Sequence, residues 1–218
     1  MPCRDEENTV GCCVDEAFVY LTDRNMNGEV IVVDNCSADE SARVALDHGA
    51  RLIEETGRGY GNAIRCGLNE AAGEYIIIVD CDMTYDLSDI DSIIKLLDEG
   101  SDLVIGDRFL GSIEKGAMPY LNRVGGKILS AIARRRFHVK INDFHCGIRG
   151  IRHESLQRMS LRTEGMEFAT EMIAQAKEAG LTISQTPVSL KRCPVHRHSK
   201  LRIFRDGARH LVYIIRKT

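Results

Sequence analysis

Long apolar runs are absent from this sequence of 218 residues. Its longest uncharged apolar stretches, such as 75–79 and 30–33, are far shorter than the roughly 20 residues that a helix needs to cross a bilayer. The chain also does not open with a basic segment followed by an apolar one, which is the pattern of a secretion signal. We therefore expect a protein without a membrane-spanning segment that stays in the cytosol.

Paired cysteines are missing as well. The eight cysteines are scattered and form no Cys-x-x-Cys pair, so the sequence indicates neither a zinc site nor a disulfide framework. In a reducing compartment such cysteines serve as small buried hydrophobic residues. The length suits one α/β domain with a substantial core, and no repeat or low-complexity segment divides the chain. We expect residues 1–218 to form a single domain.

Charge is unevenly distributed along the chain, although the net charge is only −3. Residues 1–110 carry 24 Asp and Glu against 8 Lys and Arg, whereas residues 111–218 carry 8 against 21. The two halves therefore have formal charges near −16 and +13. The acidic half could hold a metal ion, and the basic half could hold an anionic substrate or lie on an anionic membrane face.

Short apolar strands alternate with helical patterns. Strands are expected at 29–34, 51–54, 75–79, 102–106 and 182–190. Helices are expected from a turn at Ser37 and Asp39 to about 48, from the glycine-rich turn at 57–61 to 72, and at 88–97, 118–137 and 167–179. This alternation predicts an α/β fold with a doubly wound, mostly parallel sheet. Residues 142–147 are expected to form a loop.

The strand at 75–79 ends in two carboxylates one residue apart, Asp80 and Asp82. Open α/β sheets bind ligands at the carboxyl ends of their strands. A divalent cation held by one or two carboxylates plus substrate phosphates is the usual magnesium arrangement, so the pattern indicates phosphate chemistry through a metal. By itself the pair is explained equally well if one Asp caps the next helix and the other is solvated.

Two other strand ends place polar groups at the same edge of the predicted sheet. Asp34 ends the strand at 29–34 and could cap a helix or reach a ribose or base. The segment Gly57–Gly61 could cradle a phosphate through helix N-terminal amides, but it matches neither glycine-rich nucleotide-binding pattern and is better explained as a tight turn. Together with Asp80 and Asp82 these groups form the line of contacts that a nucleotide diphosphate requires.

The helix expected at 118–137 is amphipathic and basic. Such a helix suits a membrane surface or an anionic ligand, and a solvated basic face over a packed apolar stripe explains the pattern as well. Its apolar residues include Leu121, Val124 and Ile128, and its basic residues include Arg123 and Lys127.

Six motifs in a fixed order carry a resemblance to a known family. They lie at 2–7, 32–39, 80–82, 102–109, 143–149 and 199–211. They resemble motifs of the family 2 glycosyltransferases. In the same order, the first five resemble that family's Pro-x-x-Asn-Glu-Glu, Val-Asp-Asp-x-Ser-x-Asp, Asp-x-Asp, Asp-Leu-Val-x-Gly-Ser-Arg and Asp-x-x-Ser/Cys-Gly-x-Arg. The sixth resembles the segment that precedes the membrane helices in that family. These enzymes have the GT-A fold. The resemblance is to their dolichol-phosphate mannosyltransferase-like branch, which uses polyprenyl-phosphate acceptors.

The resemblance implies a role for individual residues. The nucleoside pocket would be lined by Pro2, Arg4, Glu6 and Asp34, with Arg58 beside it. The metal ion, Mg²⁺ or Mn²⁺, and the diphosphate would be bound by Asp80 and Asp82. The lipid phosphate would be gripped by Arg108 and Arg123, and Glu171 and Lys200 match positions in the acceptor region. The residues implied in catalysis are Asp80, Asp82 and Arg108.

The resemblance also implies a fold and a reaction. Residues 1–110 would form a Rossmann-like half that binds a nucleotide-diphospho-sugar, and residues 111–218 the basic acceptor half. The reaction would be an inverting, metal-dependent transfer of a sugar from GDP-mannose or a UDP-sugar to polyprenyl or dolichyl phosphate. It would take place at the cytoplasmic face of the membrane, to which the protein would bind peripherally. Nothing indicates a nucleic-acid partner.

The residues agree with this chemistry. A bound divalent ion offsets charge on the departing phosphate, and arginine matches phosphate oxygens bidentately. An acceptor that is already anionic needs little help from a general base. The histidines of the basic second half, His145, His196, His198 and His210, are therefore expected in loops, at the surface or in contact with phosphate.

Two departures from the family pattern leave other functions open. The family's first, central strand precedes the motif at Pro2, and here Met1 stands directly before it, so we expect that strand to be missing. Asp5 also replaces the usual Asn, and Thr84 stands where some relatives have Gln as a third metal ligand. One alternative is a sugar nucleotidyltransferase, although residues 1–15 lack its glycine-rich loop. The other is a non-catalytic nucleotide-binding remnant.

Overall fold

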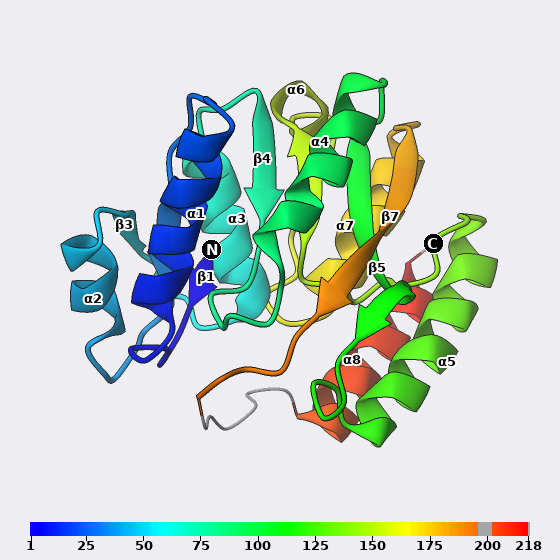
Figure 1. The fold of residues 1–218 in the computed structure, drawn as a ribbon. Helices are drawn as coiled ribbons and strands as arrows, with labels where there is room; N and C mark the ends of the chain where they lie inside the picture. The colour runs from blue at the N-terminus through cyan, green and yellow to red at the C-terminus, as the bar shows by residue number, and fades with distance from the viewer. Residues whose placement is uncertain (196–201, 218) are drawn as a thin grey trace.

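A computed structural model describes residues 1–195 and 202–217 as an α/β fold in which helices cover both faces of the strands (Figure 1). The strands are β1 (Pro2–Cys3), β2 (Ile31–Asp34), β3 (Arg51–Glu54), β4 (Tyr75–Ile78), β5 (Leu103–Ile113), β6 (Arg149–Arg152) and β7 (Ile183–Leu190). The helices are α1 (Val10–Asp23), α2 (Ser41–Asp47), α3 (Tyr60–Glu70), the 3₁₀ turn η1 (Leu87–Asp89), α4 (Ile90–Asp98), α5 (Tyr120–Phe137), α6 (His153–Leu156), α7 (Phe168–Glu178) and α8 (Ile203–Arg216).

The strands form two sheets. In the first, β2 lies between β1 and β3, and all three strands are parallel. The second has the order β4-β6-β5-β7, with β6 antiparallel to β4 and β5, and β7 parallel to β5. The predicted α/β class is confirmed, and the five predicted strands are present. The antiparallel strand β6 was not predicted, because its residues were assigned only to a loop motif.

The main core lies between the second sheet and the helices on its two faces. In Figure 1, α1 and α4 lie in front of the strands, and α3 and α7 lie behind them. Ile93 and Leu97 of α4 are fully buried, as are Phe168 and Met172 of α7. Spacings of four residues put each pair on one face of its helix. Fully burying side chains of this size contributes about 1.5–3 kcal/mol each.

A second, smaller core lies around β1, β2, α1 and α2. It includes Cys3 and Cys13 together with Val10, Val14 and Val32. All eight cysteines are free, and half of them are buried. Within residues 1–195 and 202–217 no cluster of three or more His, Cys, Asp or Glu side chains could hold a metal ion. Cys3 and Cys13 pack in this core among aliphatic side chains.

The chain has no full strand between β2 and β4 among its described residues. β1 is only two residues long and pairs with β2 alone, with Pro2 opposite Val33 and Cys3 opposite Asp34. Among the described residues, no strand is therefore hydrogen-bonded to both β2 and β4. Helix α1 joins the two parts of the fold, since Val14 packs in the smaller core and Tyr20 in the main one.

The C-terminal part of the chain folds back onto the domain. In Figure 1, α8 lies beside α5 at the lower right, and it also contacts α7. The amphipathic helix predicted at 118–137 is α5, and α8 lies within the basic half of the chain, 111–218. Among the described helices, none combines the length and the apolar character that crossing a bilayer requires.

Candidate functional site

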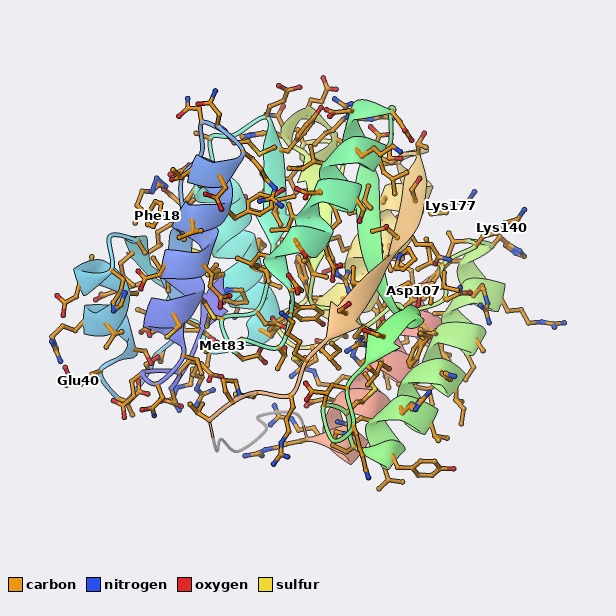
Figure 2. All side chains as sticks on the ribbon, viewed as in Figure 1. Phe18, Glu40, Met83, Asp107, Lys140 and Lys177 are labelled. Atoms are coloured by element: carbon orange, nitrogen blue, oxygen red, sulfur yellow. The ribbon has the colours of Figure 1, made fainter. Side chains whose placement is uncertain are left out.

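The two carboxylates that follow β4 are held in a tight loop. Asp82 is buried, and its Oδ1 accepts hydrogen bonds from the backbone nitrogen of Thr84 at 3.1 Å and from the Thr84 hydroxyl. Met83, between them, has a positive φ of 59°, which turns the chain sharply after the strand. Figure 2 shows Met83 on the side of the molecule toward which β4 runs. Thr84 thus orients Asp82 rather than standing in for a third ligand.

Asp80 is placed by two segments that are distant in sequence. The hydroxyl of Tyr60, the first residue of α3, donates to Oδ1 of Asp80 at 3.1 Å. Burial and then the charge of Asp80 raise the pKa of Tyr60 well above its usual value, so this hydroxyl remains a donor. On the other side, a Cβ added at Gly147 would lie 2.1 Å from Oδ2 of Asp80. Only glycine at position 147 leaves room for the carboxylate.

The amides of the turn before α3 are used within the protein. The backbone nitrogens of Gly61 and Asn62 donate to the carbonyl of Glu164 at 2.9 and 3.3 Å, and that of Gly59 donates to Oδ1 of Asn35 at 2.7 Å. Gly59 has a φ of 146°, and a Cβ there would lie 2.1 Å from the Glu164 oxygen. The interpretation as a tight turn is therefore confirmed, and a phosphate cradle made by these amides is excluded. The turn serves the site through Tyr60.

Asp34 ends β2 with one carboxylate oxygen available to a ligand. Its Oδ2 accepts a hydrogen bond from the backbone of Ser37 at 3.2 Å, whereas its buried Oδ1 has no hydrogen-bond partner among the described residues. A buried acceptor without a donor costs about 1–3 kcal/mol, so a ligand hydroxyl or N–H there would recover that energy. Two further residues predicted for the nucleoside pocket, Arg4 and Glu6, lie in the segment after β1. Glu6 is buried, and Nε of Arg4 is 3.6 Å from Oδ2 of Asp5.

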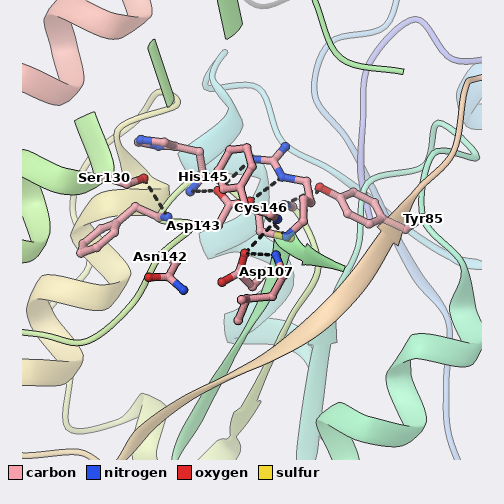
Figure 3. Close-up of polar contacts among 12 residues, drawn as sticks. Tyr85, Asp107, Ser130, Asn142, Asp143, His145 and Cys146 are labelled. Carbon is pink, nitrogen blue, oxygen red and sulfur yellow. Dashed lines mark hydrogen bonds and ion pairs between the residues drawn. The ribbon is translucent and has the colours of Figure 1, made fainter. Parts of the chain in front are cut away.

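Arg108 is fixed by a buried ion pair. Its Nε and Nη2 donate to the two carboxylate oxygens of Asp143 at 2.6 and 2.9 Å (Figure 3). Asp143 is fully buried, whereas a small part of Arg108 remains exposed. The preceding residue, Asp107, accepts from the backbone of Phe109 at 2.9 Å and shapes the irregularity in β5 beside Arg108. Arg108 also lines the cavity described below. The third nitrogen of its guanidinium, Nη1, is not among those that donate to Asp143.

The loop between Asp143 and Gly147 is built around a second buried arginine. Arg149 is 3% exposed and donates to three backbone carbonyls, those of Phe144, Cys146 and Ala169, at 2.7–2.9 Å. The backbone nitrogen of Gly147 donates to the hydroxyl of Tyr85 at 2.8 Å, next to the loop in Figure 3. These contacts hold Gly147 against Asp80. Asp143 and Gly147 belong to a motif noted in the sequence, whereas nothing in the sequence indicated Tyr85.

Two histidines pack against each other, with His210 buried and His145 half-buried, contrary to the expectation that they lie at the surface or in contact with phosphate. The rings of His145 and His210 pack edge to face with centroids 4.5 Å apart, and His210 lies in α8. Nδ1 of His210 is 2.8 Å from the hydroxyl of Thr170, while both ring nitrogens of His145 lack a partner among the described residues. Burial is the main cause that lowers the pKa of both, to about 4 for His210. Both rings are therefore neutral at pH 7.

A cavity of about 1170 Å³ is lined by several of these side chains, among them Tyr60, His145 and His210. Asp80 and Asp82 lie in its lining together with Arg108, and residues of α5 and α8 line the rest. The cavity therefore joins the acidic half of the chain to the basic half. A molecule in it would contact carboxylates at one end and a guanidinium and apolar helices at the other.

Four predicted residues lie elsewhere or play another part. Arg123 is exposed on α5 and does not line the cavity, and Arg58 is exposed beside the turn before α3. Glu171 is buried, and its carboxylate accepts from the backbones of residues 162 and 163, so it holds a loop and not an acceptor. Lys200 lies outside the described residues, as do His196 and His198.

A divalent cation fits the residues at the end of β4. Asp80 and Asp82 supply hard oxygen donors, and Gly147 leaves the space that a side chain would fill. The described residues offer no third His, Cys, Asp or Glu in the same group. This donor set matches Mg²⁺ or Mn²⁺, which keep positions for water and substrate phosphates, better than a closed protein cage such as zinc requires.

Nearly the whole chain is similar to known proteins. Residues 1–160 match the model of the family described as "Glycosyl transferase family 2". The low-salt glycan biosynthesis hexosyltransferase Agl6 of Haloferax volcanii is 32% identical over 217 residues, which cover 99% of this chain and 52% of that protein. The dolichyl-phosphate hexose transferase of the same organism is 30% identical, covering 84% of this chain and 78% of that protein. The chain spans about half the length of the first of these relatives.

Solved structures share the fold. Glucosyl-3-phosphoglycerate synthase from Mycobacterium tuberculosis, in complex with Mn²⁺, uridine-diphosphate and phosphoglyceric acid, has a TM-score of 0.75 at 21% identity. The match covers 98% of this chain and 75% of that one. Mannosyl-3-phosphoglycerate synthase from Rubrobacter xylanophilus has a TM-score of 0.74 at 17% identity, covering 99% and 71%. At these identities the likeness establishes the GT-A fold.

The buried histidines predict a loss of stability in acid. The folded protein holds His210 with a pKa of about 4, below its unfolded value near 6.5, so the unfolded chain binds more protons between these limits. Stability from this group is fully present above pH 6.5 and falls by up to about 3 kcal/mol as the pH drops through 4.

The variant His210→Asn can keep the contact with Thr170 and removes the titrating ring. The free energy of unfolding should be measured with urea between pH 4 and 7, and in His210→Asn it should depend less steeply on pH than in the wild type. The matched variant His153→Asn, away from this cluster, should keep the wild-type slope. Equal slopes for wild type and His210→Asn would show that this ring does not control acid stability.

Proposed function

The chain belongs to glycosyl transferase family 2, and on this premise we propose that it transfers a sugar from a nucleotide sugar to a polyprenyl phosphate, with inversion at the sugar. One observation carries the proposal. The cavity that contains Asp80 and Asp82 also contains Arg108 and is continued by the apolar residues of α5 and α8. Such a cavity can bind a diphosphate at one end and a lipid phosphate at the other.

The donor is proposed to lie on the acidic half. Nucleoside recognition is assigned to the turn after β1 and to Asp34, whose unpartnered Oδ1 suits a ribose hydroxyl or a base N–H. Asp80 and Asp82 would hold Mg²⁺ or Mn²⁺ next to the donor diphosphate. When bound, the cation acts as a Lewis acid that offsets the charge developing on the leaving phosphate. The Mn²⁺ and uridine-diphosphate named for the M. tuberculosis structure support this choice.

The residues around the metal-binding carboxylates are proposed to position them. Thr84 and Tyr60 orient Asp82 and Asp80 through the hydrogen bonds described above. Gly147 and the loop behind it set how deep Asp80 can lie. The amides before α3 are occupied by Glu164, so the charge of the diphosphate must be met by the cation and by side chains.

The acceptor is proposed to enter between α5 and α8. Arg108 lines that side of the cavity, and its ion pair with Asp143 fixes the direction of its guanidinium. Leu121 and Ile128 of α5 are more than half exposed and also line the cavity, so an isoprenoid chain could lie along them. The name of the dolichyl-phosphate hexose transferase supports a polyprenyl-phosphate acceptor. A phosphate acceptor is already an anion, so transfer needs no strong general base.

The same surface is proposed to rest on the cytoplasmic face of a membrane. Besides its exposed apolar residues, α5 carries the cations Arg123, Lys127 and Arg134–Arg136. A helix with apolar and basic residues on its exposed surface binds the interface of an anionic bilayer. Peripheral binding would bring the cavity to the height of the acceptor headgroup.

The metal assignment is tested by Asp82→Asn, which keeps an oxygen for the Thr84 contacts but removes the charge. We expect the transfer rate to fall at least about 100-fold, or about 2.7 kcal/mol in the barrier, because the cation loses a ligand. Donor binding should be measured by calorimetry with and without Mn²⁺, using GDP-mannose, UDP-glucose and UDP-N-acetylglucosamine.

The control is Asp23→Asn, which removes an exposed carboxylate at the end of α1 and should leave binding and transfer unchanged. Unchanged transfer in Asp82→Asn would refute the role of this carboxylate. Failure of every donor to bind the wild type with Mn²⁺ would instead favour the non-catalytic remnant.

Gly147→Ala tests the placement of Asp80. The added Cβ would displace the Asp80 carboxylate, so Mn²⁺-dependent binding of the donor should weaken at least about tenfold while the far-ultraviolet circular dichroism is retained. Gly125→Ala, in α5, is the matched control, since its added Cβ meets no atom within 4 Å. Wild-type donor affinity in Gly147→Ala would contradict the proposed fit.

Membrane binding is tested by co-sedimentation with vesicles of phosphatidylglycerol and of phosphatidylcholine. Ile128→Glu should lower the fraction bound to the anionic vesicles, with a dissociation constant raised about tenfold, because an apolar contact is replaced by a charge of the wrong sign. Leu46→Glu changes an equally exposed leucine on α2 and should bind as the wild type does. Equal binding of the two variants would refute the assignment of α5 to the membrane.

A further inference from the structure

Three side chains with hydroxyl groups line the candidate active-site cavity in the part of the chain that the structure describes. Tyr60 and Thr84 each donate their proton to one of the two carboxylates that follow β4. The third is Tyr85, which lies between these carboxylates and η1 and is 6% exposed. The protons of the first two hydroxyls are thus committed within the protein, whereas that of Tyr85 is not.

The hydroxyl oxygen of Tyr85 accepts hydrogen bonds, but no described residue accepts its proton. The backbone nitrogen of Gly147 donates to this oxygen at 2.8 Å, and the thiol of Cys146 is a weak donor at 3.8 Å. A tyrosine hydroxyl has one proton to donate in addition to the bonds that it accepts. A buried donor without an acceptor is unfavourable, so a ligand oxygen that accepts this proton would be bound favourably.

The ring of Tyr85 lies beside Asp80. A Cβ added at Gly147 would lie 2.1 Å from Oδ2 of Asp80 and 3.1 Å from Cε2 of Tyr85, the ring carbon next to the one that bears the hydroxyl. In Figure 3 the hydroxyl points toward the loop that carries Cys146. The carboxylate and the hydroxyl therefore border the same part of the cavity.

Tyr85 is a donor without a charge. Burial is the main cause that raises the pKa of its hydroxyl well above the ordinary value, and the charge of Arg108 opposes only part of that rise. The hydroxyl therefore keeps its proton at pH 7, and Arg108 is close enough to act on it electrostatically. Another cation beside Asp80 would compete with a metal ion for the carboxylate, whereas a neutral hydroxyl does not.

We propose that the Tyr85 hydroxyl donates a hydrogen bond to the phosphate monoester of the acceptor, next to Arg108. This inference rests on the proposed function and adds a substrate contact to it. Asp143 engages two of the three guanidinium nitrogens of Arg108, so a doubly charged phosphate there needs further donors. The diphosphate of the donor is instead met by the cation at Asp80 and Asp82, in the arrangement proposed above.

The test is Tyr85→Phe, which keeps the ring and removes the hydroxyl. Two phosphate monoesters serve as probes in calorimetry with Mn²⁺: citronellyl phosphate, a soluble prenyl phosphate, and 3-phosphoglycerate. The dissociation constant of one of them should rise at least about tenfold, because a hydrogen bond to a charged group is lost. The probe that responds identifies the source of the phosphate, a lipid or a soluble acid.

Donor binding separates this role from a purely structural one. Arg149 still holds the loop through the carbonyls of Phe144 and Cys146 when the Tyr85 hydroxyl is removed. The Mn²⁺-dependent affinity for the nucleotide sugar should therefore change much less than the affinity for the phosphate probe.

Tyr75→Phe is the matched control. It removes a hydroxyl that donates to Asp98 at 2.7 Å, at the other end of β4 and outside this cavity. Both affinities should stay at their wild-type values in this variant.

Three results would overturn the proposal. The first is equal binding of both phosphate probes by the wild type and by Tyr85→Phe, and the second is a wild type that binds neither probe. The third is a loss of donor affinity as large as the loss of phosphate affinity, since Tyr85 would then act only through Gly147 and Asp80. A wild type that binds a phosphate probe through Tyr85 but transfers no sugar would refute the proposed transfer and leave this contact in place.

Discussion

The arrangement of the candidate active-site cavity depends on the burial of the Arg149 guanidinium. A buried cation must find acceptors for its N–H groups, and here three backbone carbonyls provide them. Two of these carbonyls belong to the loop between α5 and β6, and the third belongs to α7. The loop is thereby fixed in one conformation, with Gly147 against Asp80 and with Asp143 under Arg108. The hydrogen bonds of Arg149 thus help to set the positions of both Asp80 and Arg108 in the cavity.

The division of charge in the sequence becomes a division of the cavity in space. Asp80 and Asp82 come from the acidic half of the chain. Arg108 lies at the end of that half, and helices α5 and α8 belong to the basic half. His145 and His210 also line the cavity and stay neutral, because burial disfavours the imidazolium and lowers the pKa of both rings. Neither ring therefore adds a positive charge to the cavity, whose other charged lining residues include Arg108, Glu114 and Arg192.

Much of the fold could be predicted from the sequence, because strands such as 75–79 are continuous apolar runs and helices such as α4 have regular apolar spacing. The carboxylates at the end of β4 were predicted for the same reason, since strand direction fixes where they lie. The contacts that position them were harder to foresee. His210 and Glu164 reach the site from distant segments, and Tyr85 acts through Gly147, which is 62 positions away in the sequence. No local pattern records such tertiary contacts. Strand β6 was missed because its residues, with Arg149 and Gly150, do not look like a strand.

The carbonyl of Glu164, which accepts hydrogen bonds from the first turn of α3, restricts how the two halves of the chain can move against each other. It joins a loop of the second half of the chain to the turn at Gly59–Gly61 in the first half, through two backbone hydrogen bonds and a contact that leaves no room for a Cβ. Opening the domain like a hinge between its halves would break these bonds and expose the amides. These contacts therefore oppose a hinge motion between the two halves of the chain and favour movement of the two segments together.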